Sequence, residues 1–274
     1  MSAFEHEHDV LDWYTNQERR LTNDFISTIE WSEVSKHELD ERFLPVLVYM
    51  RDIEKFTEIY YEELCRTSTG RDPIIRSFMD KWSTEEDTHA VLINRFLQEA
   101  GYPTTEQWYD EVRARIPRRK HVSRRILPLI TNCFGKEFSA VHMTWGAINE
   151  MTALTSYQRL WTLADHPVLT KILRNIAGEE GAHVSFYWNV ARLQLARSGY
   201  SRQLTKFIIS KFWTPVGQGL KGISDSNMII RTLYSGPGGL EVVKKQINDR
   251  VQLLPGLESV NSPLHRFSEP LATA

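Results

Sequence analysis

The stretches Glu86-Asp87-Thr88-His89 and Glu180-Gly181-Ala182-His183 repeat one pattern, Glu-x-x-His, and this repetition predicts the fold. A Glu and a His three positions apart lie on one face of a helix about one turn apart, so both side chains can reach the same metal ion. Each pattern follows a helical segment with a candidate inward-facing carboxylate. Glu54 lies 32 residues before the first pattern, and Glu150 lies 30 residues before the second. Four carboxylates and two imidazoles are the ligand set of a carboxylate-bridged di-iron or di-manganese centre inside a four-helix bundle.

The residues around both patterns favour buried helices over solvated ones. A single Glu-x-x-His occurs often by chance, but two copies with upstream carboxylates at nearly equal distances are much less expected. Apolar residues recur at three- and four-residue intervals on the side of each helix that carries the His. These residues are Phe78, Met79, Trp82 and Leu92 around the first pattern, and Ile172, Ile176, Phe186 and Val190 around the second.

The ligand assignment follows from the two patterns. Each ion is expected to receive one neutral imidazole, with carboxylate oxygens completing a site that keeps open positions. We expect Glu54 and His89 on one ion, Glu150 and His183 on the other, and Glu86 and Glu180 as bridging or chelating ligands. Glu58 lies one turn after Glu54 on the same face and is an alternative ligand. Trp82 and Glu179 are candidate outer partners of the histidines.

Length and composition indicate an ordinary globular protein. The chain has 274 residues, of which 41% are hydrophobic and 25% charged. We expect a single domain over residues 1–260 and a C-terminal tail over residues 261–274. No apolar run approaches the ~20 residues that span a bilayer, and no signal-peptide core is present at the N-terminus. With only Cys65 and Cys133, the chain has no disulfide framework, so a cytoplasmic location is expected. The net charge of −2 and the absence of a nucleic-acid motif give no reason to expect a nucleic-acid partner.

Periodicity predicts helices throughout the chain and no convincing strand. The breaks at 68–73 and 165–167 contain the Gly and Pro residues that end helices. We therefore predict an all-α protein, a four-helix bundle with additional N- and C-terminal helices. The expected helical segments are 9–30, 39–66, 74–100, 104–116, 134–164, 168–198, 202–213 and 238–252.

The motifs resemble those of the soluble acyl-acyl-carrier-protein desaturases. Trp82-Ser83-Thr84-Glu85-Glu86-Asp87-Thr88-His89 is similar to their Trp-Thr-Ala-Glu-Glu-Asn-Arg-His, and Gly178-Glu179-Glu180-Gly181-Ala182-His183 to their Ala-Asp-Glu-Lys-Arg-His. Val46-Leu47-Val48, followed by Glu54 and Tyr60, matches their first ligand helix in spacing, and Asn149-Glu150-Met151-Thr152 takes the place of Gln-Glu-Arg-Ala. The similarity covers roughly residues 20–255 at low identity.

The resemblance implies a ferritin-like fold and also a function. Members of the family use two iron ions and O2 to insert a cis double bond into a fatty acyl chain carried on acyl carrier protein, and they form homodimers. Because the chain has no flavin, nicotinamide or iron–sulfur motif, an external electron donor such as ferredoxin is expected. The chain departs from the family at Lys55, where a second Glu is usual, and at Glu179, where an Asp is usual. Ala153 replaces a Thr that the family links to oxygen handling, and Thr152 beside it is a candidate partner at the centre.

A cluster of basic residues between the second and third ligand helices is a candidate docking surface. Acyl carrier protein is acidic, so complementary charge would steer it there, although such a cluster is also compatible with a solvated loop. The cluster consists of Arg113, Arg115, Arg118, Arg119, Lys120, Arg124 and Arg125.

Other functions are compatible with the same ligand set. A di-iron oxygenase would hydroxylate or N-oxygenate another substrate, and a ferritin-like protein would bind iron without catalysis. A ribonucleotide reductase small subunit is disfavoured, because Ile93 stands where that family has its radical Tyr. The sequence leaves open iron or manganese, acyl carrier protein or coenzyme A, acyl chain length and double-bond position.

Overall fold

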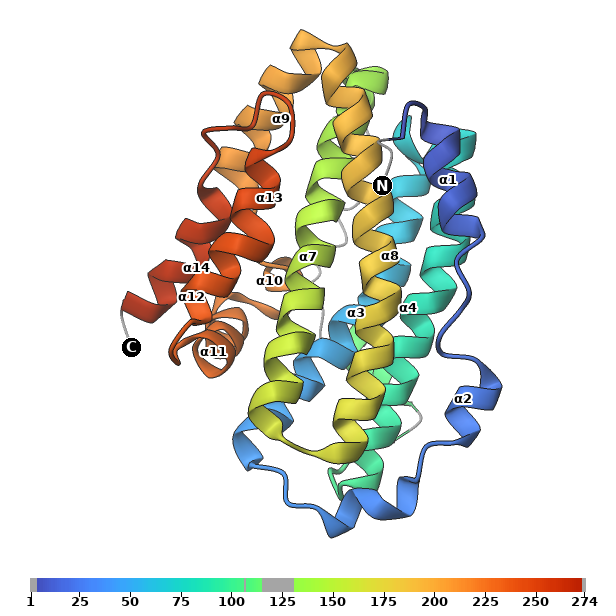
Figure 1. Ribbon diagram of the computed structural model, residues 1–274, viewed down its shortest axis with the longest axis vertical. Coiled ribbons are helices and arrows are strands. Elements are labelled where there is room, and N and C mark those ends of the chain that lie inside the picture. The colour runs from blue at the N-terminus through green and yellow to red at the C-terminus, as the bar shows by residue number, and fades with distance from the viewer. Residues whose placement is uncertain (1–3, 106, 115–130, 273–274) are drawn as a thin grey trace.

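The structure is a computed structural model that describes residues 4–105, 107–114 and 131–272. None of these residues is in a β-strand, and most are helical. The all-α class expected from the sequence is therefore confirmed, and the long helices form a bundle (Figure 1). None of the described helices combines the length and apolar character needed to cross a bilayer.

The helices are short at both ends of the chain and long in the middle. The α-helices are α1 (Glu7–Thr15), α2 (Asn23–Ser27), α3 (Leu44–Cys65), α4 (Pro73–Glu99), α5 (Trp108–Ala114), α7 (Ser139–Ala164), α8 (Pro167–Arg197), α9 (Gly199–Phe212), α10 (Gln218–Lys221), α11 (Ile223–Tyr234), α12 (Gly239–Val243), α13 (Asp249–Gln252) and α14 (Ser262–Ala272). Short 3₁₀ turns lie at η1 (Trp31–Lys36), η2 (Glu41–Phe43), η3 (Thr69–Arg71) and η4 (Gly135–Phe138), and η5 (Lys244–Asn248) is a π-helical turn.

Two hairpins of long helices build the centre of the molecule. Helix α3 packs on α4, and α7 packs on α8 (Figure 1). Local signals set the helix ends. Asp72 caps α4 by accepting a hydrogen bond from the Ile74 amide at 2.9 Å, and Pro73 occupies the first turn. Helix α7 ends at Asp165, which has a left-handed backbone with φ of 46°, and α8 begins at Pro167. The chain breaks expected at 68–73 and 165–167 are thus where the hairpins turn.

The remaining helices cover this four-helix centre. Helices α9, α11 and α12 contact α7 and lie on one side of the bundle, whereas α1 contacts α4 and α8 on the other (Figure 1). The long helices bury apolar side chains between them, such as Val46, Phe78, Met143 and Phe186, each of which is fully buried or nearly so. Burial of these faces, more than helix propensity, stabilises helices of this length.

Two expectations for the chain ends are wrong. Residues 9–30 do not form one helix, because α1 ends at Thr15 and α2 begins at Asn23. The backbone amides of Arg20 and Leu21, between these helices, donate to the carboxylate of Glu179 and not to helix carbonyls. The expected mobile tail at 261–274 is instead helical over Ser262–Ala272, because Phe267 is buried against Tyr234 with ring centroids 5.1 Å apart. The division of the chain into domains stays a prediction.

A close approach between α7 and α8 depends on a glycine. A Cβ atom added to Gly146 would lie 2.4 Å from the ring of Tyr187, which is fully buried. Gly146→Ala is therefore expected to destabilise the protein by about 1–3 kcal/mol, the usual cost of overpacking a core. Urea unfolding measures this change. Gly181→Ala is the matched control on α8, since nothing lies within 4 Å of its added Cβ, and it should be neutral or slightly stabilising. Equal stabilities of the two variants would contradict the prediction.

Candidate metal centre

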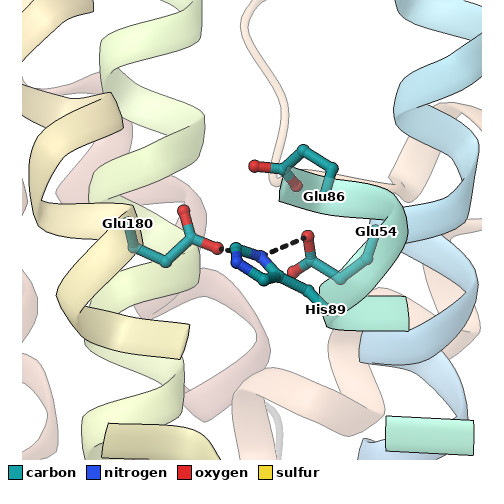
Figure 2. A group of neighbouring side chains, drawn as sticks. All are labelled: Glu54, Glu86, His89 and Glu180. Carbon is teal, nitrogen blue, oxygen red and sulfur yellow. Dashed lines mark ion pairs between the residues drawn. The ribbon is translucent and has the colours of Figure 1, made fainter. Parts of the chain in front are cut away.

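Six side chains from the four long helices converge in the middle of the bundle. Helix α3 supplies Glu54, α4 supplies Glu86 and His89, α7 supplies Glu150, and α8 supplies Glu180 and His183. All six are buried, with exposed fractions between 0% and 6%. Figure 2 shows four of them, with the imidazole of His89 directed between the carboxylates of Glu54 and Glu180. The structure thus brings together the six residues of the expected ligand set, and the alternative ligand Glu58 is not among them.

The six residues form two overlapping groups of four. The first is Glu54, Glu86, His89 and Glu180, and the second is Glu86, Glu150, Glu180 and His183. Within each group, one ligand atom from each residue lies within 4.8 Å of the others. Glu86 and Glu180 belong to both groups, so they are placed to bridge two ions. The other residues divide as the sequence analysis expected, with one Glu and one His for each ion.

Both histidines present Nδ1 to the carboxylate cluster. His89 Nδ1 lies 3.2 Å from Glu180 Oε1, and His183 Nδ1 lies 3.0 Å from Glu86 Oε1. The two imidazole rings are 6.0 Å apart between centroids. A metal-ligating His usually binds through one ring nitrogen and donates the other N–H to an oxygen acceptor. Here Nδ1 of both rings faces the carboxylate cluster and would be the atom that binds a metal ion.

The outward-facing Nε2 atoms each contact a second carboxylate. His89 Nε2 lies 3.0 Å from Glu179 Oε2, and His183 Nε2 lies 2.9 Å from Glu85 Oε2. We refer to Glu85 and Glu179 as the outer carboxylates. Glu179 was expected from the sequence to partner a His, whereas Glu85 was passed over. Glu85 lies about 100° around α4 from Glu86 and so points away from the six-residue cluster, but this direction faces His183 on α8. The signal that could have found it is that an acidic residue precedes the Glu in both patterns.

The charges of the cluster are strongly coupled. Burial and the neighbouring charges of Glu54 and Glu180 raise the pKa of Glu86 well above its ordinary value. Burial and the charge of Glu180 likewise raise the pKa of Glu150. Burial opposes ionisation of Glu180 as well, but the two histidines outweigh it and lower the pKa of this carboxyl. Four buried carboxylates therefore need positive charge beside them, from protons or from metal ions.

The pKa values of the histidines are raised, and those of the outer carboxylates are lowered. Burial works to lower the pKa of His183, but hydrogen bonds with Glu180 and Glu85 outweigh it and raise the pKa to about 10. The pKa of His89 is raised for the corresponding reasons, with Glu179 and Glu180 as its strongest partners. Although burial opposes ionisation of the outer carboxylates, their histidine partners hold the pKa values of both below the ordinary range.

Unpartnered buried atoms test whether metal ions fit the centre. Among the described residues, Glu86 Oε1, His89 Nδ1 and Glu180 Oε1 are buried and make no hydrogen bond of good geometry, although each lies near an oppositely charged group of the cluster. A buried polar atom without a partner costs about 1–3 kcal/mol. All three atoms belong to the predicted ligands, so ions bound between them would satisfy them together. Oxygen and imidazole donors suit iron, manganese or zinc.

Tyrosine and tryptophan side chains enclose the centre. The Tyr157 hydroxyl donates a short hydrogen bond to Glu54 Oε1. Trp82, expected as an outer partner, contacts the rings of Tyr60 and Tyr187 and makes no hydrogen bond through Nε1 within the described residues. Thr152, the other candidate partner, donates to the Ile148 carbonyl of its own helix at 2.8 Å and lines the small cavity beside Glu54.

The alternative first-helix ligand lies outside the cluster. The side chain of Glu58 is 41% exposed and pairs with Lys55 and Arg113 on the surface. Glu54 is 4% exposed and belongs to the first ligand group. Lys55, the departure from the desaturase pattern, forms an ion pair with Asp87 and points away from the centre. The geometry therefore favours Glu54 over Glu58.

The predicted docking surface lies mostly outside the described residues. Arg113 is described, and it contacts Glu58 at 3.6 Å and the ring of Tyr109. The other residues of the basic cluster fall within 115–130, which are not described. The docking role stays a prediction.

Two apolar cavities lie next to the ligand helices. The smaller, of about 40 Å³, is lined by Glu54 together with apolar side chains such as Met50, Ile53 and Ile230. The larger, of about 780 Å³, is an open groove bordered by α7, α9 and the chain around α10. Pro215 and Val216 line both cavities. The two cavities therefore share part of their lining, and the smaller one reaches a predicted ligand, Glu54.

Fold and site together define an all-α protein with a buried carboxylate–histidine cluster that could hold metal ions. No protein-family model matches the chain, and no curated protein matches it. The resemblance to the desaturases thus rests on the motifs quoted above and on their spacing.

Proposed function

We propose that this protein is an O2-dependent oxidoreductase of the di-iron class that inserts a cis double bond into a fatty acyl chain held on a carrier. The observation that carries this proposal is the pair of overlapping ligand groups, which share Glu86 and Glu180. Two ions held by bridging carboxylates, each with one imidazole and open positions, are suited to redox chemistry with O2. The apolar cavity against Glu54 supports an apolar substrate.

The residues of the chain have distinct tasks in this proposal. When bound, the metal pair supplies the capacity to reduce O2 and remove hydrogen from an unactivated methylene. The six ligands hold the ions on rigid helices, and the outer carboxylates orient the histidines. Tyr157 keeps Glu54 in place through its hydroxyl. The apolar walls of the small cavity would exclude water beside Glu54, and the larger apolar cavity, of about 780 Å³, has room for an acyl chain.

The reaction balances only with an external reductant. One –CH2–CH2– unit, one O2, two electrons and two protons give one –CH=CH– unit and two waters. A separate donor such as ferredoxin would supply the electrons, and acyl carrier protein or coenzyme A would carry the chain. The protein would act as a homodimer, as the desaturases that it resembles do.

Product mass is the test of this function. The protein is loaded with ferrous iron and incubated with stearoyl-acyl carrier protein, reduced ferredoxin and O2, and the released acyl chain is weighed by mass spectrometry. Loss of two hydrogen atoms supports the desaturase. Gain of one oxygen atom would instead indicate a hydroxylase built on the same centre.

His183→Ala is the control variant for this assay, because it removes a predicted ligand and should give no product. If the iron-loaded protein develops the absorption of an oxo-bridged diferric site but leaves several acyl carriers unchanged, the acyl-chain function is wrong although the metal centre stands.

A further inference from the structure

The last turn of helix α1 and the chain that follows it cross the outside of the metal centre. We name residues 14–21 the N-terminal strap. It runs over α4 and α8 at the level of the outer carboxylates, and strap residues together with Glu85 and Glu179 line a polar cavity of about 660 Å³. The strap supplies none of the six predicted ligands. Its contacts with both outer carboxylates nevertheless connect it to the centre.

Tyr14 contacts the outer carboxylate on the His183 side. Its hydroxyl donates to Glu85 Oε2 at 2.5 Å, and the same oxygen accepts from His183 Nε2 at 2.9 Å. Tyr14 is 1% exposed, and its ring packs against Phe78 and Phe186. The aromatic contacts fix the ring, so the hydroxyl has a defined position from which to hold Glu85.

Backbone amides contact the outer carboxylate on the other side. The Arg20 and Leu21 amides donate to Glu179 Oε1 at 2.8 Å and 2.9 Å, and Glu179 Oε2 accepts from His89 Nε2 at 3.0 Å. The side chain of Arg20 crosses α8 at Gly178, where an added Cβ would lie 2.3 Å from Arg20 Cδ. The strap thus holds one outer carboxylate through a phenol and the other through main-chain amides.

We propose that the N-terminal strap positions the histidine ligands of the metal centre through the outer carboxylates, and that Tyr14 is a positioning residue for only one of the two ions. Tyr14 holds Glu85, Glu85 orients His183, and His183 binds one ion. The strap amides perform the corresponding task for His89 and the other ion. This inference rests on the proposed metal centre, and it is independent of the acyl-chain reaction.

The physical reason is that the outer partner sets the orientation and basicity of a ligating imidazole. Loss of such a partner commonly lowers metal affinity about 10- to 100-fold. Without the Tyr14 hydroxyl, Glu85 keeps His183 and a more distant Lys81, whose Nζ is 3.8 Å from Glu85 Oε1. The carboxylate can then turn, and His183 loses its fixed direction. No contact of Tyr14 reaches Glu179 or His89, so the effect should be confined to one ion.

The test compares Co²⁺ binding by the wild-type chain and by Tyr14→Phe. Calorimetry gives the affinities of the two sites, and visible absorption reports the geometry of each bound Co²⁺. In Tyr14→Phe, one ion is expected to bind about 10-fold more weakly with an altered spectrum, and the other to keep its affinity. Tyr234→Phe is the matched control, because it removes an equally buried hydroxyl that bonds Ser156 at 2.8 Å and not a residue of the centre. It should leave both affinities unchanged.

A double-mutant cycle separates positioning from general destabilisation. If Tyr14 acts through Glu85, Tyr14→Phe should add no further loss in a Glu85→Gln background. In a Glu179→Gln background, Tyr14→Phe should lower the Co²⁺ affinity as much as it does in the wild type. The reason is that Glu179 orients His89, the ligand of the other ion. A uniform weakening of both ions by Tyr14→Phe, or an unchanged isotherm and spectrum, would overturn the inference. A wild-type chain that binds no Co²⁺ would overturn it together with the metal centre, whereas a chain that binds two ions but oxidises no acyl chain would overturn the proposed reaction alone.

Discussion

Glu180→Ala is expected to abolish the binding of both metal ions, whereas Glu150→Ala should remove only one. Glu180 belongs to both ligand groups and approaches both histidines, at 3.2 Å from His89 Nδ1 and 3.3 Å from His183 Nδ1. Glu150 belongs to one group. Because loss of an outer partner alone costs about 10- to 100-fold in affinity, loss of a shared ligand should exceed about 100-fold for each ion. Metal analysis after gel filtration measures the number of bound ions in each variant, and Co²⁺ titration measures their affinities.

The control for this pair is Glu58→Ala. Glu58 lies one turn after Glu54 on α3, but its side chain is 41% exposed and outside both groups. This variant should bind two ions as the wild type does. If Glu180→Ala retained one ion with wild-type affinity, Glu180 would not be a bridging ligand.

Metal affinity is expected to rise steeply with pH through the neutral range. In the metal-free protein, His183 has a pKa of about 10, and the pKa values of His89, Glu86 and Glu150 are raised well above their ordinary values. Metal coordination needs neutral imidazoles and ionised carboxylates, so each ion must displace protons. The apparent affinity should change by about tenfold per pH unit for each proton released. Calorimetric titration with Mn²⁺ at several pH values, in buffers of different ionisation enthalpy, measures both the affinity and the proton count.

The metal-free protein should show the opposite dependence. A group whose pKa is raised by folding contributes stability that is complete below its unfolded pKa and is lost as the pH rises through its folded pKa. For His183 this interval runs from 6.5 to about 10. The melting temperature of the metal-free chain should therefore fall across this interval, while the stabilisation by bound metal increases. An affinity that does not vary with pH would contradict the proposed ligand set.

Local patterns were sufficient for the fold class and for the six converging side chains. A Glu and a His three positions apart must share a helix face. Two such faces, and the two helices that each carry a lone Glu, can bury these polar residues only by packing together around counter-charge. The helix ends at Asp72 and Pro167 were also visible, because capping residues and prolines act within one turn. The sequence did not decide between Glu54 and Glu58, because both lie on one face of α3. Packing against the other helices buries Glu54 and leaves Glu58 exposed.

The sequence by itself determined that helices carry two repeated carboxylate–histidine patterns, since helical periodicity is a property of neighbouring residues. Only the tertiary structure decided which groups support those patterns from outside. The role of Glu85 has no local signal, because its partner, His183, is on another helix. Helical periodicity extends through the strap, but its amides at Arg20 and Leu21 bond Glu179, a residue far along the chain. Residues Ser262–Ala272 form helix α14, where a tail was expected, for the same reason. The burial of Phe267 depends on its contact with Tyr234 of α11, which is distant in the sequence. Contacts between distant segments have no local signature, and they complete this centre.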